Sequence, residues 1–355
     1  MSLTDLGWDE RFAAEFASLA AAPDVEPGRV AIEFNYLYRV YVTSGEIEAV
    51  LAGRVRHHAS SRGDLPAVGD WVGVRRRDDP RGAIVFVLPR RTRFSRRMAG
   101  NTTDEQVVAA NIDVVFITMA LDADFSVRRL ERYLLMARES GAEPVVVLTK
   151  PDLADDLPAR VTDVVTVAAD AAVHVVSPRT GEGLEAIRKR LAPGATGALL
   201  GSSGVGKTTI INQLAGGAPR ATREVRASDS KGRHTTTHRE LIRMPGGGLV
   251  IDTPGMRELQ LWDAPEGVRQ TFDDIETLAP GCHFGNCRHR DEPKCAVKQA
   301  VAEGTLDGAR LESYVKLQDE LSFLAQQQDQ RAQIEERRRA KVATKALNAH
   351  LKTKR

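Results

Sequence analysis

Residues Gly201–Thr209 carry the clearest chemical signal in the chain, because they match the pattern of a phosphate-binding loop. They read Gly-Ser-Ser-Gly-Val-Gly-Lys-Thr-Thr. The glycines let backbone N–H groups surround a β-phosphate, while Lys207 reaches the β- and γ-phosphates and Thr208 gives a hydroxyl to Mg²⁺. The alternative is a glycine-rich turn without nucleotide, which the length of the match disfavours. The residues expected to contact the nucleotide here are Gly201, Ser202, Ser203, Gly204, Val205, Gly206, Lys207, Thr208 and Thr209.

Two segments after this loop have the composition of nucleotide switches. Asp252-Thr253-Pro254-Gly255 follows an apolar run, so Asp252 is expected to hold the Mg²⁺ shell and Gly255 to donate its N–H to the γ-phosphate. Of the threonines at 235–237, Thr236 is our candidate for the second hydroxyl on Mg²⁺. His234 is a candidate for positioning the attacking water, and an exposed loop histidine is the alternative.

Met256 directly follows the switch glycine, where Ras-like enzymes place the glutamine that orients water. A thioether cannot do this. Either another side chain completes the site, or turnover is slow until a partner does so.

A base-reading segment is predicted at Thr149, Lys150, Pro151 and Asp152. The Asp152 carboxylate can accept from N1–H and the 2-amino group of guanine, and Lys150 can pack over the base. Thr149 stands where most GTPases have Asn, so its hydroxyl can replace only part of the amide's tethering. The segment beginning at Ser177 (Ser-Pro-Arg-Thr-Gly) is expected to back the base. A surface turn is the alternative for both segments.

The order of these segments along the chain is unusual. The base reader and base backer precede the phosphate loop, and the two switches follow it. This is a circular permutation of the ordinary GTPase order.

A second set of residues has the composition of a metal site. Cys282, Cys287, His289 and Cys295 lie within fourteen residues and include all three cysteines of the chain. Three thiolates and one imidazole suit a closed, structural Zn²⁺ site. His283 is a competing ligand, and buried thiols without metal are the alternative.

The elements that position these residues change character along the chain. Residues 3–22 have apolar residues at helical spacing, and from 29 to about 94 the pattern is of short strands, including 36–42, 47–55, 70–75 and 83–88. About five strands suggest a small barrel, with the OB-fold favoured and an SH3-like barrel as the alternative.

Further along, buried strands alternate with helices. We predict strands at 113–121, 144–148, 197–200 and 248–251, and helices at 126–140 and 207–215. This pattern indicates a parallel, helix-covered sheet. A helix at 311–324 is predicted beyond the cysteines.

Positive charge gathers in two places. Residues 51–100 hold twelve arginines and four acids, and residues 331–355 hold nine Lys or Arg. Such patches favour contact with a polyanion, through Arg75–Arg77 and with Trp71 and Phe94 available for stacking. The alternative is that the arginines pair with neighbouring acids or face solvent.

The bulk composition sets limits on the class of protein. A chain of 355 residues allows two or three domains, and 42% hydrophobic with 28% charged residues is ordinary for a globular protein. No apolar run approaches the roughly 20 residues needed to span a bilayer, and the N-terminus lacks a signal-peptide pattern. We expect a cytoplasmic monomer that does not bind membranes.

Together these motifs resemble the circularly permuted ribosome-biogenesis GTPases called RsgA or YjeQ. The resemblance covers nearly the whole chain, including Gly69–Val72, Leu88–Arg91, Ala109–Asp113, Lys231–Thr237 and the Cys₃His pattern. It implies a multidomain α/β protein with an N-terminal OB-fold, a central circularly permuted P-loop GTPase domain and a C-terminal zinc-binding helical domain. The expected boundaries are a helical extension at 1–28, the OB-fold at 29–98, the GTPase domain at 99–263, the zinc-binding domain at 264–330 and a basic tail at 331–355.

The resemblance also implies binding to the small ribosomal subunit and its 16S rRNA, and hydrolysis of GTP to GDP and phosphate that the subunit stimulates. GTP or GDP, Mg²⁺ and one structural Zn²⁺ are the expected ligands. The competing hypothesis is an RNA-binding assembly protein in which nucleotide is mainly a structural ligand. The permuted order also lets the second switch lead directly into the C-terminal domain, a possible mechanical route.

Overall fold

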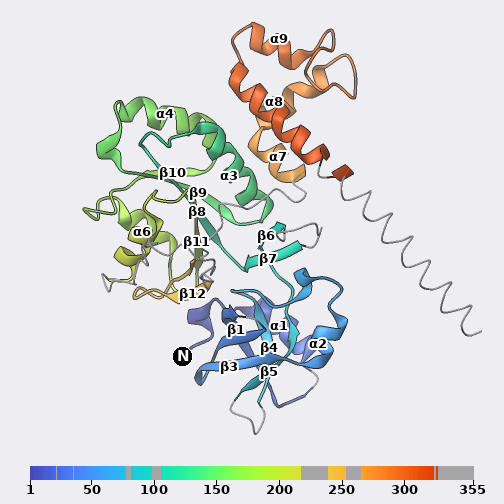
Figure 1. Ribbon diagram of the computed structural model, residues 1–355, viewed down its shortest axis with the longest axis vertical. Coiled ribbons are helices and arrows are strands. Elements are labelled where there is room, and N and C mark those ends of the chain that lie inside the picture. The colour runs from blue at the N-terminus through green and yellow to red at the C-terminus, as the bar shows by residue number, and fades with distance from the viewer. Residues whose placement is uncertain are drawn as a thin grey trace, which may run out of the picture. The chain divides into compact units, whose positions relative to one another are not determined.

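The computed structural model describes residues 1–20, 22–34, 36–76, 81–97, 105–216, 239–252, 265–323 and 325–326. The chain divides into two compact units (Figure 1). The first contains residues 1–96, 104–260 and 265–271, and the second contains 97–103, 261–264 and 272–355. Several predicted features lie outside the described residues: His234, Thr236, Gly255, Met256, Arg77 and the basic tail.

A five-stranded barrel opens the first unit. Its strands are β1 (Val25–Phe34), β2 (Leu37–Val42), β3 (Gly45–Leu51), β4 (Trp71–Arg75) and β5 (Gly82–Val87). The long β1 pairs with both β2 and β4, β3 runs parallel to β5, and β4 pairs with β5, which closes the barrel. A buried aliphatic cluster around Val40 and Ile84 fills it. The predicted OB-fold is therefore confirmed.

The segment before the barrel is not the single helix that was predicted for residues 3–22. A 3₁₀ turn, η1 (Thr4–Leu6), ends at Gly7, whose φ of 86° breaks the helix, and α1 (Glu10–Leu19) follows. Asp9 caps α1 by accepting from the N–H of Phe12 at 3.1 Å. The Trp8 ring packs edge-on against Trp71 with centroids 4.7 Å apart, so α1 lies against the barrel.

Two further expectations for the barrel were wrong. The strand predicted at 47–55 stops at Leu51, and residues 53–58 instead form the short helix α2 (Gly53–His58), which has no buried residue. Trp71 and Phe94 are 0% and 3% exposed, so neither can stack on a base as predicted. Aromatic residues in this barrel serve its core.

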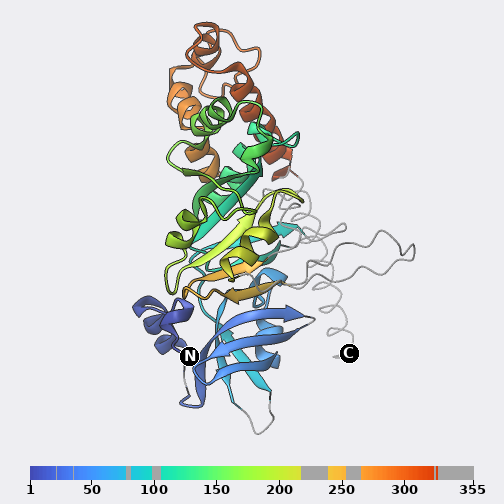
Figure 2. The ribbon, with the colours of Figure 1, turned by 90° about the vertical axis from the view of Figure 1, so that its left-hand side faces the viewer.

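The central sheet contains five parallel strands. In spatial order these are β10 (Ala172–Val175), β9 (Glu143–Thr149), β8 (Val114–Ala120), β11 (Thr196–Leu200) and β13 (Leu249–Asp252). All seven residues of β8 are buried, as expected for a strand covered on both faces. The antiparallel β12 (Glu240–Arg243) follows at the edge and pairs with β1 of the barrel, beside which it lies in Figure 2.

Helices connect these strands. Those of the first unit are α3 (Val127–Glu139), α4 (Leu157–Ala168), α5 (Leu184–Arg190), α6 (Lys207–Leu214) and α7 (Pro265–Thr271). Helices α5 and α6 share one hydrophobic cluster with the strands, while α3 and α4 contact each other and the strands β8 to β10. The predicted helix at 126–140 is confirmed, because Ser126 and Ser140 cap α3. The remaining short elements are η2 (Arg62–Asp64), β6 (Arg93–Arg97), β7 (Glu105–Ala110) and η3 (Pro151–Leu153).

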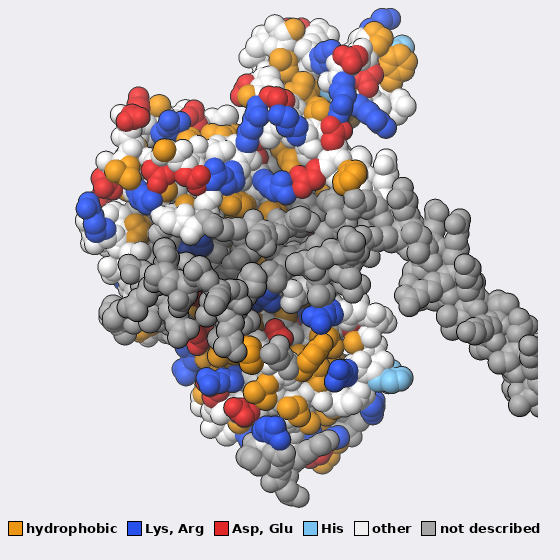
Figure 3. Space-filling model, in the orientation of Figure 1, with side chains coloured by type: hydrophobic (Ala, Val, Ile, Leu, Met, Phe, Trp, Pro, Cys, Tyr) orange, Lys and Arg blue, Asp and Glu red, His pale blue; other side chains and the backbone are white. Residues whose placement is uncertain are grey.

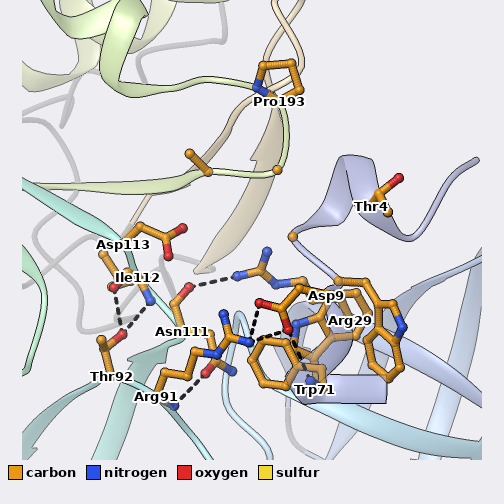
Figure 4. A pocket seen from close by; sticks show the side chains of 15 residues that line it. Thr4, Asp9, Arg29, Trp71, Arg91, Thr92, Asn111, Ile112, Asp113 and Pro193 are labelled. Atoms are coloured by element: carbon orange, nitrogen blue, oxygen red, sulfur yellow. Dashed lines mark hydrogen bonds and ion pairs between the residues drawn. The ribbon is translucent and has the colours of Figure 1, made fainter. Parts of the chain in front are cut away.

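Arg29 joins three parts of the first unit (Figure 4). Its buried guanidinium donates to the carbonyl oxygens of Leu6, Gly69 (3.2 Å) and Asn111 (2.9 Å). Burial lowers the pKa of Arg29 to about 10, so it stays charged at neutral pH. A cavity of about 340 Å³ lies beside this junction.

Asn111 completes the junction from the GTPase side. Its side chain accepts from the N–H of Arg91 at 2.9 Å and donates to the carbonyl of Gly69 at 3.1 Å. A Cβ on Gly69 would lie 2.1 Å from the carbonyl oxygen of Ala110, so only glycine fits. Three of the motifs that carried the family resemblance thus join the barrel to the sheet.

The described part of the second unit is helical. It contains α8 (Asp273–Leu278), η5 (Ala279–Gly281), α9 (Ala296–Ala302) and a helix at residues 308–323, close to that predicted at 311–324. Phe272 packs edge-on against Tyr314, with ring centroids 5.4 Å apart, and the guanidinium of Arg310 lies 5.0 Å from the Phe272 ring. These contacts form the core around which the cysteine-bearing loop is held.

Candidate functional site

The phosphate loop, the base reader and the base backer lie at one edge of the central sheet. They follow β11, β9 and β10, which are parallel, so their carboxyl ends point the same way. Ligands of open α/β sheets bind at this edge. Segments separated by about fifty residues in the sequence are brought together here.

The phosphate loop has the backbone that its glycines were expected to allow. Gly201, Gly204 and Gly206 have φ values of 154°, 76° and 100°. A Cβ on Gly201 would lie 2.1 Å from the carbonyl oxygen of Thr118 on β8, so this position requires glycine. Thr208 and Thr209 are exposed in the first turn of α6, which leaves their hydroxyls accessible to a ligand.

The lysine of the loop folds back over it. Lys207 Nζ donates to the carbonyl oxygens of Gly201 (2.8 Å) and Ser202 (2.6 Å). These neutral acceptors hold the ammonium group less strongly than phosphate oxygens would. The lysine is therefore held in place and can still transfer to an anion.

Thr149 ties the base reader to the phosphate loop. Its buried hydroxyl lies 2.7 Å from the carbonyl oxygen of Val205 and 3.3 Å from that of Met119. A hydroxyl has one proton to donate, so the shorter contact to Val205 is the stronger bond. The threonine thus makes the link to the phosphate loop, although it lacks the second donor of an asparagine.

Lys150 and Asp152 face different partners. Lys150 adopts a left-handed backbone with φ of 55°, and its Nζ lies 2.7 Å from Asp122 Oδ2. The hydrogen bond from Lys150 lowers the pKa of Asp122, so the pair is charged at neutral pH. Asp152 and Arg179 are both more than half exposed, and their closest charged atoms are 3.4 Å apart. An exposed pair at this distance is weak, so guanine can compete for the Asp152 carboxylate.

The base-backing turn is compact. Ser177 accepts from the backbone N–H groups of Gly181 (2.8 Å) and Thr180 (3.2 Å) through its carbonyl oxygen. Pro178 of this turn would lie 3.7 Å from a Cβ on Gly206, so the turn borders the phosphate loop. Asp252 ends β13, the neighbour of β11, on the same edge.

Sequence reasoning missed Asp122 and Arg179. Asp122 follows the predicted strand at 113–121, and a carboxylate just after a parallel strand is a signal that could have identified it. Arg179 was quoted within the base-backing segment, but its position opposite Asp152 depends on the fold.

The predicted metal ligands come together in the second unit. The ligand atoms of Cys282, Cys287, His289 and Cys295 all lie within 4.8 Å of one another, and His283 is not part of this group. The Sγ atoms of Cys282 and Cys295 are 3.8 Å apart, and His289 Nδ1 lies 3.6 Å and 3.4 Å from them. A tetrahedron with Zn–S bonds of about 2.3 Å has S–S edges of about 3.8 Å. The donor set therefore fits Zn²⁺.

Surrounding groups orient these ligands. Burial lowers the pKa of His289, which keeps its ring neutral and able to bind metal. Burial also raises the pKa of Cys287 to about 11, a shift that a bound dication would reverse. Glu292 accepts from the N–H groups of Arg288 (3.0 Å) and Arg290 (2.8 Å), one on each side of His289. The ligand loop is thus fixed by its own backbone contacts.

Comparison with known proteins agrees with this geometry. The sequence profile of the RsgA GTPase family matches residues 87–262. A small ribosomal subunit biogenesis GTPase RsgA from Opitutus terrae is 47% identical over 339 residues, which covers 93% of this chain and 92% of that protein. Its namesake from Syntrophotalea carbinolica is 41% identical, with 96% of each chain covered.

The chain belongs to the RsgA GTPase family. Among solved structures, it is similar to YjeQ from Thermotoga maritima, with a TM-score of 0.61 and 27% identity over 84% of this chain and 98% of that one. It is also similar to YloQ, described as a circularly permuted GTPase, with a TM-score of 0.61 and 25% identity over 85% and 97% of the two chains. The predicted family, the permuted fold and the GTP-hydrolysing activity are thereby confirmed.

Proposed function

We propose that this RsgA-family GTPase assists late maturation of the small ribosomal subunit. It binds the subunit and its 16S rRNA as a cytoplasmic monomer, and the bound subunit stimulates hydrolysis of GTP to GDP and phosphate. The observation that carries the proposal is the union of base reader and phosphate loop on one sheet edge, through the hydrogen bond from Thr149 to Val205. The support for the ribosomal role is that the relatives are named small ribosomal subunit biogenesis GTPases.

Each site residue receives a role in this proposal. Lys207 neutralises the β- and γ-phosphates, Thr208 binds Mg²⁺, and Asp252 holds the Mg²⁺ shell through water. Asp152 reads guanine, with Lys150 over the base. Thr236, Gly255 and His234 keep their proposed switch and water-positioning roles, although they lie outside the described residues.

The Cys₃His group is proposed to hold one structural Zn²⁺. Protein ligands fill all four positions of a tetrahedron, which leaves none for water or substrate. The ion would stabilise the loop between η5 and α9 and take no part in hydrolysis.

The surface that binds rRNA is proposed to differ from the one first predicted. Arg75 pairs with Asp24 at 2.7 Å and Arg76 with Glu26 at 2.5 Å, so both arginines already have acidic partners. Arg90 is largely buried against Asp70 at 2.7 Å. These pairs support the alternative that part of the arginine cluster serves the protein's own acids.

Helix α2 offers a better surface. Arg54 and Arg56 on α2 are exposed, as is Arg62 nearby, and the Arg56 guanidinium lies 5.2 Å from the partly exposed ring of Tyr36. In Figure 3, histidine and Lys or Arg side chains stand at the edge of the barrel where Figure 1 labels α2. A cationic helix beside an aromatic ring suits the phosphates and bases of single-stranded RNA.

Signal transfer to the zinc-binding unit is proposed to pass through α7. This helix follows residues 253–264 in the chain and leads directly into Phe272. The N–H of Gly267 donates to Glu139 of α3 at 3.0 Å, and Arg138 donates to Thr271 at 3.1 Å. A movement of the second switch would act on a helix that α3 already braces.

Co-sedimentation with purified ribosomal subunits tests the proposal. Wild-type protein with a non-hydrolysable GTP analogue should pellet with small subunits, and neither GDP-loaded protein nor large subunits should give the same yield. Arg54→Glu, Arg56→Glu and Arg62→Glu together should weaken binding and flatten its salt dependence, by up to about one log–log unit per lost phosphate contact. The matched control is Arg75→Ala with Arg76→Ala, which should bind nearly normally. Equal pelleting with both subunits would contradict the ribosomal role.

A further inference from the structure

One short turn holds both halves of the nucleotide site. Residues 121–126 connect β8 to α3 and carry two acids, Asp122 and Asp124. Asp122 binds Lys150 of the base reader at 2.7 Å. Asp124 binds Arg129 in the first turn of α3 at 2.6 Å. No motif in the sequence analysis included this turn or Arg129.

Arg129 reaches the phosphate loop. Its Nη1 donates to Ser202 Oγ at 2.6 Å and to Asp124 Oδ2 at 2.6 Å, and its Nη2 donates to the Asp124 carbonyl oxygen at 3.1 Å. The hydrogen bond from Arg129 lowers the pKa of Asp124, and the Ser202 hydroxyl contributes in the same direction. Asp124, Arg129 and Ser202 therefore form a closed, charge-assisted network.

Ser202 transmits this constraint to the loop. The residue lies between glycines at 201 and 204, and its carbonyl oxygen accepts from Lys207 Nζ at 2.6 Å. Glycine-rich backbone loses much conformational freedom when it is ordered. A serine held by its side chain removes part of that freedom before nucleotide binds.

We propose that Arg129 is a positioning residue, which fixes the first half of the phosphate loop through Ser202 for the β-phosphate. The proposal rests on nucleotide binding in the proposed function. The turn at 121–126 then divides its work: the Asp124–Arg129 pair serves phosphate binding, and the Asp122–Lys150 pair serves base binding. Arginine is needed because one planar guanidinium serves a carboxylate, a carbonyl and a hydroxyl together, which a lysine cannot do.

Binding of GDP and of GMP to the full-length protein tests this division, since GMP lacks the β-phosphate. Arg129→Ala should weaken GDP binding about tenfold, the low end for a charged hydrogen bond because Arg129 is a third exposed. GMP binding, measured by NMR saturation transfer, should not change. Arg129→Lys should not restore GDP affinity. The matched control is Arg128→Ala on the same helical turn, which should leave both affinities unchanged.

A double-mutant cycle identifies the route of the effect. Ser202→Ala should weaken GDP binding, and adding it to Arg129→Ala should cause little further loss, because both remove the same contact. Additive losses, unchanged GDP affinity in Arg129→Ala, or equal losses for GDP and GMP would overturn the proposal. If Arg129→Ala does not fold, as judged by its thermal melt, Ser202→Ala decides alone by its effect on GDP relative to GMP. Failure of the wild-type protein to bind GDP would instead overturn the proposed function.

Discussion

The metal site and the nucleotide site are built in opposite ways. The four metal ligands come from fourteen consecutive residues and surround one point, with ligand atoms within 4.8 Å of one another. The nucleotide site instead draws on the ends of several strands between β8 and β13, and its threonines at 208 and 209 are exposed. A closed local site suits a permanent structural ion, whereas an open, assembled site suits a ligand that must bind and leave.

The difference extends to how each site is held. At the metal site, Glu292 and the N-terminus of α9 fix the loop through local backbone contacts. At the nucleotide site, long-range contacts such as Thr149 to Val205 and Arg129 to Ser202 join separate segments. Damage to one ligand should therefore have a local, all-or-none effect at the metal site and a graded effect at the nucleotide site.

The largest effect should follow from loss of a metal ligand. Cys295→Ser should abolish zinc binding, and the second unit should unfold, because structural zinc contributes on the order of 10 kcal/mol to folding. Elemental analysis and thermal melts measure this. GTP binding by the first unit should persist, and its loss would show that the two sites are not independent.

Next in size is Lys207→Ala. Removing the ammonium group that meets the γ-phosphate should lower kcat by about a hundredfold or more. Release of phosphate under saturating GTP is the measurement, and zinc content should stay at the wild-type level. Retention of more than a tenth of the activity would mean that another cation performs this role.

Asp152→Asn should change base preference. The amide no longer accepts from both N1–H and the 2-amino group, so GDP affinity should fall about a hundredfold while XDP affinity rises. Competition titrations with GDP, XDP and ADP measure the change. Tight ADP binding by the wild-type protein would contradict the assignment of Asp152 as the guanine reader.

The smallest effect should come from Thr149→Val. It keeps the shape of the side chain but leaves the Val205 carbonyl without its donor, which should reduce stability and GDP binding by about 1 kcal/mol. Thr149→Ser keeps the hydroxyl and is the control. Equal behaviour of the valine and serine variants would show that the tether has no energetic role.

The sequence predicted local features better than assembled ones. The phosphate loop, the metal ligands and the capped helix α3 follow from residues close together in the chain, so spacing was enough to find them. The partners of Arg75 and Arg76 could not be found in this way, because Asp24 and Glu26 lie about fifty residues earlier. Trp71 was assigned to a surface for the same reason, since Trp8 and Phe12 cover it from a distant segment.

The same limit applied to the nucleotide site. Lys150 and Thr208 could be named from their motifs, whereas Asp122 and Arg129 acquire a role only when β8, β9 and β11 lie side by side. Helix α2 was hidden because Val55 continued the alternating pattern of β3 past the point where the strand ends.

Single-turnover and steady-state GTP hydrolysis, with and without ribosomal subunits, tests the central claim most directly. The isolated protein should turn over slowly, on the order of 10⁻⁴ s⁻¹, because Met256 cannot orient the attacking water. Small subunits should raise the rate at least about tenfold, and large subunits should not. A fast rate in the isolated protein that small subunits leave unchanged would contradict the account.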